Sequence, residues 1–215
     1  TDRLIAIIGA TASGKTGLAV ALAKLLDGEI LSADSRQVYR GLDLGSGKDL
    51  HEYGDVPYHL IDIADPTEEY NLYRFLADFK HAHQGVIERD KQPILCGGSS
   101  MYLHGVLTNY QLAEVERNRE QRDNWQKLTD DQLKDKLLSL KPEQHNQTDL
   151  LDRERLIRAL EIALVQSVDS SATNIEQGKP IIMAIQWPRE VRRERIKIRL
   201  QERLDAGMIE EVKAL

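Results

Sequence analysis

The sequence predicts an α/β fold in which a parallel sheet is flanked by helices, and three of its features support this. Short apolar runs recur along the chain, stretches with helical spacing of apolar residues separate several of them, and a glycine-bounded loop follows the first run. Parallel strands need long crossover connections, which helices provide. The 41% hydrophobic content is enough for a substantial buried core.

Five apolar runs are expected to form strands, at residues 4–8, 29–32, 58–63, 93–96 and 180–187. Residues 16–28, between the first two runs, have apolar residues at helical spacing and end at Gly28, a helix stop signal. Residues 71–90 form an amphipathic pattern between the third and fourth runs, and a last helix is expected from about residue 190. This alternation of strands and helices indicates βαβ units.

Residues 114–140 differ from the rest, because they are charged and carry no strand signal, which is typical of an all-helical insertion. A strong helical pattern returns at residues 148–166, with Thr148 or Asp149 as the expected N-cap, and a polar loop follows at 167–180. We therefore expect a core at residues 1–112, a helical insertion at 113–147 and a continuation of the core at 148–215. The chain ends within a helical pattern, so a further C-terminal portion is expected.

Composition narrows the class of protein. The formal net charge of −6 argues against a protein that coats nucleic acid non-specifically, although a local basic face remains compatible with it. The single cysteine, Cys96, lies in an apolar run, as expected of a buried thiol in a reducing compartment. No apolar segment approaches the ~20 residues of a membrane span, and no signal-peptide pattern is seen. We expect a cytoplasmic protein that does not contact membranes.

The glycine-bounded loop is the strongest motif in the chain. It fits G-x-x-x-x-G-K-[ST] between a strand and a helix, with Gly9, Ala10, Thr11, Ala12, Ser13, Gly14, Lys15 and Thr16. Backbone N–H groups of such a loop converge on phosphate oxygens, Lys15 adds a positive charge, and the Thr16 hydroxyl suits Mg²⁺. Asp62 or Asp65 would be the metal-holding acid of a nucleotide hydrolase, but other hydrolytic equipment is not evident. The loop therefore predicts binding of a diphosphate-like group.

Polar residues follow the second and fourth predicted strands. Asp34 comes at the carboxyl end of the second strand, where functional groups of parallel sheets gather. It suits a general base, but it equally suits a turn cap with Ser32 and Ser35. Ser99 follows two glycines after the fourth strand and offers a hydroxyl to a substrate. The glycine-rich residues 41–48, which include Lys48, suit either a substrate-side loop or an ordinary surface turn.

Five segments together resemble one family, the tRNA dimethylallyltransferases. They are GATASGKT, SADSRQVYRGLDLGSGK, VPYHLIDIADPTEEY, PILCGGSSMYL and DRERLIRALEI, and the similarity continues through RIKIRLQERLDAGMIEEVKAL. The resemblance implies a P-loop kinase-like sheet with an inserted helical domain that grips the anticodon stem. It further implies transfer of a dimethylallyl group from dimethylallyl diphosphate to N6 of adenine 37 of tRNA, with Mg²⁺ as cofactor. We expect the protein to act as a monomer.

The resemblance also assigns roles to residues. Gly9 to Thr16 would hold the donor diphosphate, with Lys15 on phosphate oxygens and Thr16 near Mg²⁺, and Arg195 would add a contact to the diphosphate. Asp34 would accept the proton of the adenine amine, and Ser99 stands where the family usually has threonine. The residues expected to contact tRNA are Asp34, Ser35, Arg36, Gln37, Ser99, Arg122, Arg155 and Arg158. For each arginine, a solvated helix face remains the alternative.

Other functions remain open at this stage. An adenylate isopentenyltransferase, which acts on free AMP, ADP or ATP, shares the phosphate loop and the acid, although the helical insertion favours tRNA. A small-molecule P-loop kinase and a non-catalytic nucleotide-binding module are further alternatives. Residues 110–121, YQLAEVERNREQ, replace a proline-containing segment that the family usually has before the insertion, so the insertion is expected to be altered.

Overall fold

The computed structural model describes residues 3–110, 119–140, 152–166 and 178–215. The chain forms two compact units, a core unit of Thr1–Tyr110 with Asn174–Leu215 and a helical unit of Gln111–Thr173. Within the described residues, no helix combines the length and the apolar character needed to cross a bilayer.

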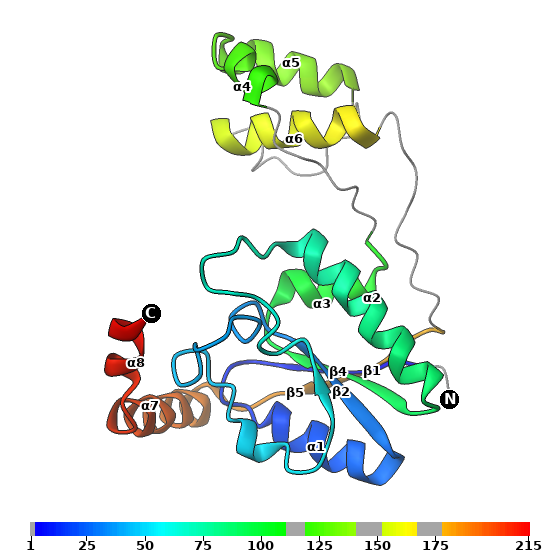
Figure 1. Ribbon diagram of the computed structural model, residues 1–215, viewed down its shortest axis with the longest axis vertical. Helices are drawn as coiled ribbons and strands as arrows, with labels where there is room; N and C mark the ends of the chain where they lie inside the picture. The colour runs from blue at the N-terminus through cyan, green and yellow to red at the C-terminus, as the bar shows by residue number, and fades with distance from the viewer. Residues whose placement is uncertain (1–2, 111–118, 141–151, 167–177) are drawn as a thin grey trace. The chain divides into compact units, whose positions relative to one another are not determined.

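The core unit contains the parallel sheet that the sequence predicts. Its strand order is β3-β2-β4-β1-β5, and every neighbouring pair is parallel (Figure 1). The strands are β1 Ile5–Gly9, β2 Gly28–Ala33, β3 Tyr58–His59, β4 Gln92–Gly97 and β5 Ile181–Ile185. The α/β fold class is therefore confirmed.

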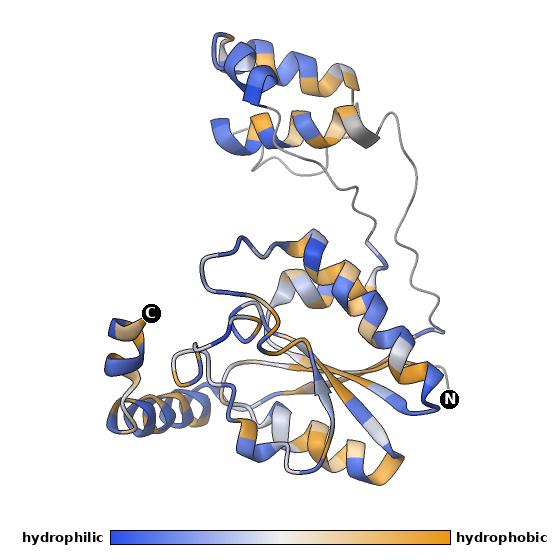
Figure 2. Ribbon diagram, viewed as in Figure 1, coloured by the Kyte–Doolittle hydropathy of each residue, from blue (hydrophilic) through white to orange (hydrophobic). Residues whose placement is uncertain are grey.

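Helices cover both faces of this sheet (Figure 1). α1 (Lys15–Leu26) lies on one face, where its buried alanines and valine pack on the apolar side chains of β1, β2 and β4. α2 (Leu72–Glu88) and α3 (Ser100–Leu107) lie on the other, and Phe75 of α2 stacks on Tyr102 of α3 with ring centroids 3.9 Å apart. Figure 2 shows the strands between them as largely hydrophobic. This burial is the main force that holds the sheet to its helices.

Three further helices of the core unit come after β2 and β5 in the sequence. A short 3₁₀ helix, η1, spans Leu50–Glu52, and the chain ends with α7 (Arg189–Asp205) and α8 (Met208–Ala214). The predicted last helix from about residue 190 corresponds to α7.

The third strand is shorter than the predicted run of residues 58–63. β3 contains only Tyr58 and His59, because Leu60 and Asp62 adopt left-handed backbone conformations with φ of 67° and 57°. Such conformations do not continue a strand. The chain pairs once more beyond this point, through a parallel bridge between Tyr39 and Ala64.

The helical unit contains α4 (Arg119–Trp125), α5 (Asp130–Leu140) and α6 (Arg153–Gln166). Their apolar faces form a separate small core, made of Trp125, Leu133, Leu137, Leu156, Ile157, Leu160 and Ala163. α6, which the expected boundary at residue 147 assigned to the core, belongs to the helical unit, because its apolar residues are buried with those of α4 and α5. Asp152 caps α6 by accepting a hydrogen bond from the Arg155 amide at 2.9 Å. Thr148, Asp149 and most of the predicted polar loop lie outside the described residues.

A buried carboxylate links the helices of this unit. Glu161 is 2% exposed and accepts hydrogen bonds from Arg122 Nε at 2.7 Å and from Arg158 Nη1 at 3.0 Å. Burial by itself raises the pKa of the Glu161 carboxyl, but the two arginines outweigh it and hold this pKa below the usual 4.5. Arg122 also reaches Glu154, whose side chain is 70% exposed, at 3.3 Å.

We expect Glu161→Gln to destabilise this unit by roughly 2 kcal/mol at neutral pH, because two arginines lose their buried acceptor. A carboxyl with a depressed folded pKa contributes stability above its unfolded pKa, and this is lost as pH falls through the folded pKa. The difference between wild type and Glu161→Gln should therefore shrink below about pH 4.5. Thermal unfolding followed by circular dichroism at pH 7 and pH 3 checks this.

The matched control is Glu154→Gln, which removes an exposed partner of the same arginine and should cost less than about 0.5 kcal/mol. A difference that is equally large at both pH values would show that shape, and not charge, explains the role of Glu161.

Candidate functional site

The phosphate loop joins β1 to α1 at the carboxyl edge of the sheet. Ala12 and Gly14 take left-handed conformations with φ of 58° and 89°, which turn the chain tightly before α1 begins at Lys15. Glycine adopts this conformation without strain, which explains its place at position 14. The first turn of α1 carries no acidic residue, so its N–H groups and its positive dipole end are open to an anion.

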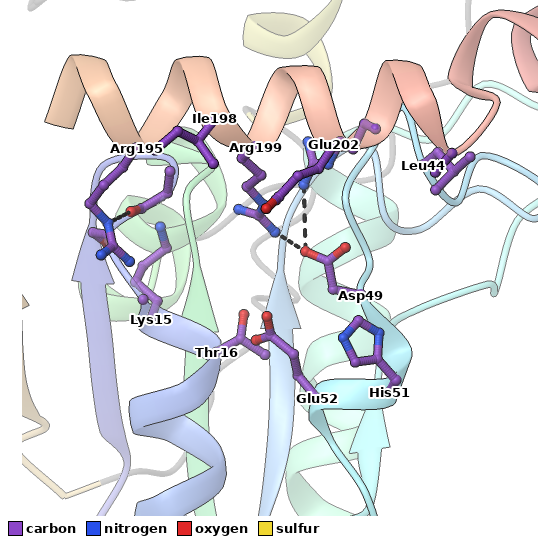
Figure 3. Close-up of a pocket in the computed structure, with 15 residues that line it drawn as sticks. Lys15, Thr16, Leu44, Asp49, His51, Glu52, Arg195, Ile198, Arg199 and Glu202 are labelled. Atoms are coloured by element: carbon purple, nitrogen blue, oxygen red, sulfur yellow. Dashed lines mark hydrogen bonds and ion pairs between the residues drawn. The ribbon is translucent and has the colours of Figure 1, made fainter.

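A pocket of about 570 Å³ lies over this loop (Figure 3). Three segments of the core unit line it: the phosphate loop with the start of α1, the chain between residues 44 and 52, and one face of α7. The lining residues are Ala12, Ser13, Gly14, Lys15, Thr16, Leu44, Asp49, His51, Glu52, Arg195, Ile198, Arg199, Glu202, Arg203 and Ala206.

Cations are concentrated on two walls of the pocket. Lys15 comes from the loop, and Arg195, Arg199 and Arg203 project from α7 at intervals of four residues, which places them on one helix face. Burial lowers the pKa of the Lys15 ammonium, while the nearby Asp34 carboxylate acts in the opposite direction. Lys15 Nζ donates a hydrogen bond to the Ala10 carbonyl at 2.7 Å. This set of donors suits an anion with several charges, such as a diphosphate.

The start of α7 is fastened to the phosphate loop by two side chains. Arg195 Nε donates to the Ala12 carbonyl at 2.7 Å, and Trp187 Nε1 donates to the Ser13 carbonyl at 2.9 Å. The Arg195 guanidinium also lies over the Trp187 ring, 5.3 Å from its centroid. Arg195 thus lies beside the loop, and its expected contact to a diphosphate stays a prediction. The sequence did not identify Trp187 as a site residue, because a tryptophan that follows an edge strand belongs to no recognisable motif.

The loop also contains a polar atom suited to a ligand. Ser13 is 4% exposed, and its hydroxyl has no hydrogen-bond partner among the described residues. A buried hydroxyl without a partner is costly, and this one belongs to a residue that lines the pocket.

The metal-holding residues expected from the sequence are only partly in place. Thr16 lines the pocket, and Glu52 faces the same space (Figure 3). Asp62 pairs instead with Lys48, and Asp65 caps a turn by accepting from the Thr67 amide at 3.0 Å. Within the part of the chain that the structure describes, no cluster of three or more His, Cys, Asp or Glu could hold a metal alone. The pocket therefore fits Mg²⁺ only together with ligand oxygens and water.

Asp34 and Ser99 follow the carboxyl ends of β2 and β4, and Ser99 contacts the residue after Asp34. The strands approach so closely that a Cβ on Gly97 would lie 2.1 Å from the Ala33 carbonyl oxygen. Ser99 Oγ accepts from the Ser35 amide at 2.8 Å and donates to Ser35 Oγ at 3.1 Å. Ser99 therefore holds the turn that carries Asp34.

Asp34 forms the turn cap that the sequence allowed, and its role as a general base stays a prediction. Its Oδ1 accepts from the Arg36 amide at 2.9 Å, as a turn cap does, while Oδ2 has no hydrogen-bond partner within the described residues. Gly98, which follows Gly97, lies close to the phosphate loop: a Cβ on Gly98 would be 4.0 Å from Lys15 Nζ. The carboxylate and the cationic pocket are thus neighbours at one edge of the sheet.

The residues expected to contact tRNA differ in their surroundings. Arg36 is exposed and its amide donates to Asp34, whereas the Gln37 side-chain amide bonds Ser32 Oγ and the Gly47 carbonyl at 3.1 Å each. In the helical unit, Arg122 and Arg158 serve the buried Glu161, and Arg155 is exposed. Whether any of them contacts tRNA stays a prediction.

The glycine-rich loop is part of the pocket and is held in place. Lys48 is 1% exposed, and its ammonium bonds Asp43 at 2.6 Å, Asp62, and the Tyr39 carbonyl at 2.8 Å. It therefore anchors the loop and does not face a ligand. Asp49, which the sequence analysis did not single out, accepts from Arg199 and lies 3.5 Å from Arg203.

Two family models match the chain: the IPP transferase model matches residues 37–215, and the isopentenyl transferase model matches residues 2–53. Among curated relatives, tRNA dimethylallyltransferase 2 of Syntrophotalea carbinolica is 51% identical, over 100% of this chain and 72% of the relative. The tRNA dimethylallyltransferase 1 of Geotalea daltonii is 50% identical, over 99% of this chain and 69% of the relative.

Solved structures give the same result. The full-length tRNA isopentenylpyrophosphate transferase of Bacillus halodurans aligns with a TM-score of 0.67 and 31% identity, over 100% of this chain and 70% of that one. A eukaryotic dimethylallyltransferase solved while acting on tRNA has the same fold, with a TM-score of 0.78 at 24% identity over 99% of this chain and 55% of that one. The chain belongs to the IPP transferase family of enzymes.

Proposed function

We propose that this protein transfers the dimethylallyl group of dimethylallyl diphosphate to N6 of adenine 37 in the anticodon loop of tRNA, with release of diphosphate. The observation that carries the proposal is the position of Asp34 beside a cationic phosphate-loop pocket. A pocket that holds the leaving group and an acid that accepts the proton of the amine are the two requirements of this reaction.

The pocket suits the donor's diphosphate. Lys15 and the arginines of α7 balance its charge, and the Ser13 hydroxyl and the N–H groups at the start of α1 supply hydrogen bonds. Mg²⁺, when bound through Thr16 and the diphosphate oxygens, would neutralise further charge on the leaving group. Together these groups stabilise the negative charge that develops on the diphosphate, which is usually the largest contribution to catalysis at such a site.

The reaction breaks the bond between the allylic carbon and the diphosphate oxygen and forms a bond from that carbon to N6. The electron pair of the broken bond leaves with the diphosphate. The amine gives up one proton, and the unpaired Oδ2 of Asp34 is the group we assign to accept it, while Oδ1 keeps the turn in place. Such a general base contributes about 10²- to 10⁴-fold in rate.

Access of an adenine to this site requires that the base leaves its stack in the anticodon loop. Exposed Arg36 and Arg155 are suited to phosphate contacts, and Ser35 and Ser99 offer hydroxyls beside Asp34. We assign Gln37, Arg122 and Arg158 to tRNA binding as well, with the difference that their side chains also have partners within the protein. We also propose that the protein works as a monomer in the cytoplasm.

A labelled-donor assay tests the proposal. We expect label from dimethylallyl diphosphate to enter tRNA, and a tRNA with guanine at position 37 to remain unlabelled. Label that enters AMP but not tRNA would favour an adenylate isopentenyltransferase. ATP turnover without any transfer of label would contradict both and favour a kinase.

Removal of the proposed base should separate chemistry from binding. We expect Asp34→Asn to lower kcat by about 10²- to 10⁴-fold, because the amide cannot accept the proton, while dimethylallyl diphosphate binds as before. Single-turnover transfer and calorimetric donor binding measure the two effects. Asp65→Asn, a change at an exposed turn cap outside the pocket, is the matched control and should leave both unchanged. Equal loss of binding and transfer in Asp34→Asn would mean that Asp34 is structural.

Ser99 should act through its hydroxyl. Ser99→Ala removes the acceptor of the Ser35 amide and frees the turn of Asp34, so we expect kcat to fall about tenfold with little change in donor KM. Ser99→Thr keeps the hydroxyl and should retain most of the activity. If alanine and threonine are equally impaired, packing at this position matters and hydrogen bonding does not.

A further inference from the structure

Three consecutive backbone amides of the glycine-rich loop converge on one carboxylate. The N–H groups of Asp43 and Leu44 donate to Glu211 Oε2 at 3.0 and 2.7 Å, and that of Gly45 donates to Oε1 at 2.9 Å. Glu211 belongs to α8, more than 160 residues further along the chain. Successive amides arranged in this way form a concave anion site, and here the protein fills it with its own side chain.

The surroundings favour this contact. A Cβ on Gly45 would lie 3.3 Å from Glu211 Oε1, so glycine leaves room for the carboxylate. The side chain of Asp43 points to Lys48, at 2.6 Å, which neutralises a charge that would otherwise repel Glu211. Hydrogen bonds between amides and a charged acceptor are roughly twice as strong as neutral ones.

The segment held by Glu211 is a wall of the donor pocket. Leu44, whose amide makes the shortest of the three contacts, lines the pocket directly. At the other end of the segment, Asp49 lies in the pocket with Arg199 and Arg203 of α7 (Figure 3). α7 and α8 therefore hold residues 43–49 from both ends.

The same segment reaches the turn of the proposed base. The Gly47 carbonyl accepts from Gln37 Nε2 at 3.1 Å and from Arg199 Nη2 at 3.4 Å. A Cβ on Gly47 would lie 1.7 Å from Arg203 Nη2, so the arginine packs directly on this backbone. A shift of residues 43–49 would first disturb Arg199 and Arg203, which contact this segment directly. The turn of Asp34 would be affected less.

We propose that Glu211 is a positioning residue for donor binding: it fixes residues 43–49 as the pocket wall and thereby orients Arg199 and Arg203 toward the diphosphate. This inference rests on the proposed function and concerns the same site. Glu211 acts through the loop and touches neither substrate, so its effect belongs to donor affinity and not to the chemical step.

The test is a KM-against-kcat comparison of Glu211→Gln with wild type, in transfer from dimethylallyl diphosphate to tRNA. Gln keeps the size of the side chain, but its NH₂ group would face one of the loop amides. We expect the donor KM to rise about tenfold, with kcat changed less than about twofold and the tRNA KM raised less than the donor KM. Glu210→Gln removes the same charge from the exposed neighbouring position and should behave as wild type.

A merely structural role predicts another result, a lower melting temperature and a smaller active fraction with an unchanged donor KM, and this would overturn the proposal. If Glu211→Gln does not fold, Gly45→Ala is tested in its place. The added Cβ of alanine shifts the Glu211 carboxylate by only a few tenths of an ångström, so the protein should still fold. The shift weakens the contact to the loop amides and should also raise the donor KM. An unchanged KM in that variant also overturns it. Failure of wild type to transfer the label would instead contradict the proposed function.

Discussion

The close approach of β2 and β4 at Gly97 and Ala33 is the constraint on which the site depends. Only a residue without a side chain fits at Gly97, since a Cβ would lie 2.1 Å from a backbone oxygen. This contact sets the start of α3 against the end of β2, where Ser99 holds the turn of Asp34. Because β1 lies on the other side of β4, the phosphate loop emerges at the same edge. The close backbone packing thus brings the two turns to one edge of the sheet, and the Ser99 hydroxyl then holds the turn of Asp34.

The pocket also needs a second wall opposite the phosphate loop, and α7 forms it. Arg195 and Trp187 fasten its start to the loop, while Arg199 and Arg203 bind the segment around Asp49. Asp49 pairs with Arg199 and lies 3.5 Å from Arg203, so one carboxylate holds two guanidinium groups beside the pocket. The pocket is therefore assembled from segments at both ends of the core unit's sequence.

The helical unit illustrates a different use of arginine. Arg122 and Arg158 converge on a carboxylate that is 2% exposed, and Arg153 donates to the carbonyls of Gln126 and Leu128 at 3.0 and 2.8 Å. A small three-helix core buries little apolar surface, so such polar contacts contribute a larger share of its stability. The arginines of a unit proposed to bind nucleic acid thus divide between those that hold its helices together and those, such as Arg155, that remain exposed.

Local patterns in the sequence predicted four of the five strands closely, the main helices of the core unit and the phosphate loop, because each depends on residues close together in the chain. The family was recognised from the order of several such segments along the chain. Asp34, Ser99 and Arg195 were also identified from local position or resemblance, and the structure brings them to one edge of the sheet. Only the tertiary structure decided that Lys48 is buried, that α6 packs on α5, and that Glu211 and Trp187 hold the pocket together. Those contacts join residues far apart in the chain, and neither periodicity nor a motif encodes which distant groups meet.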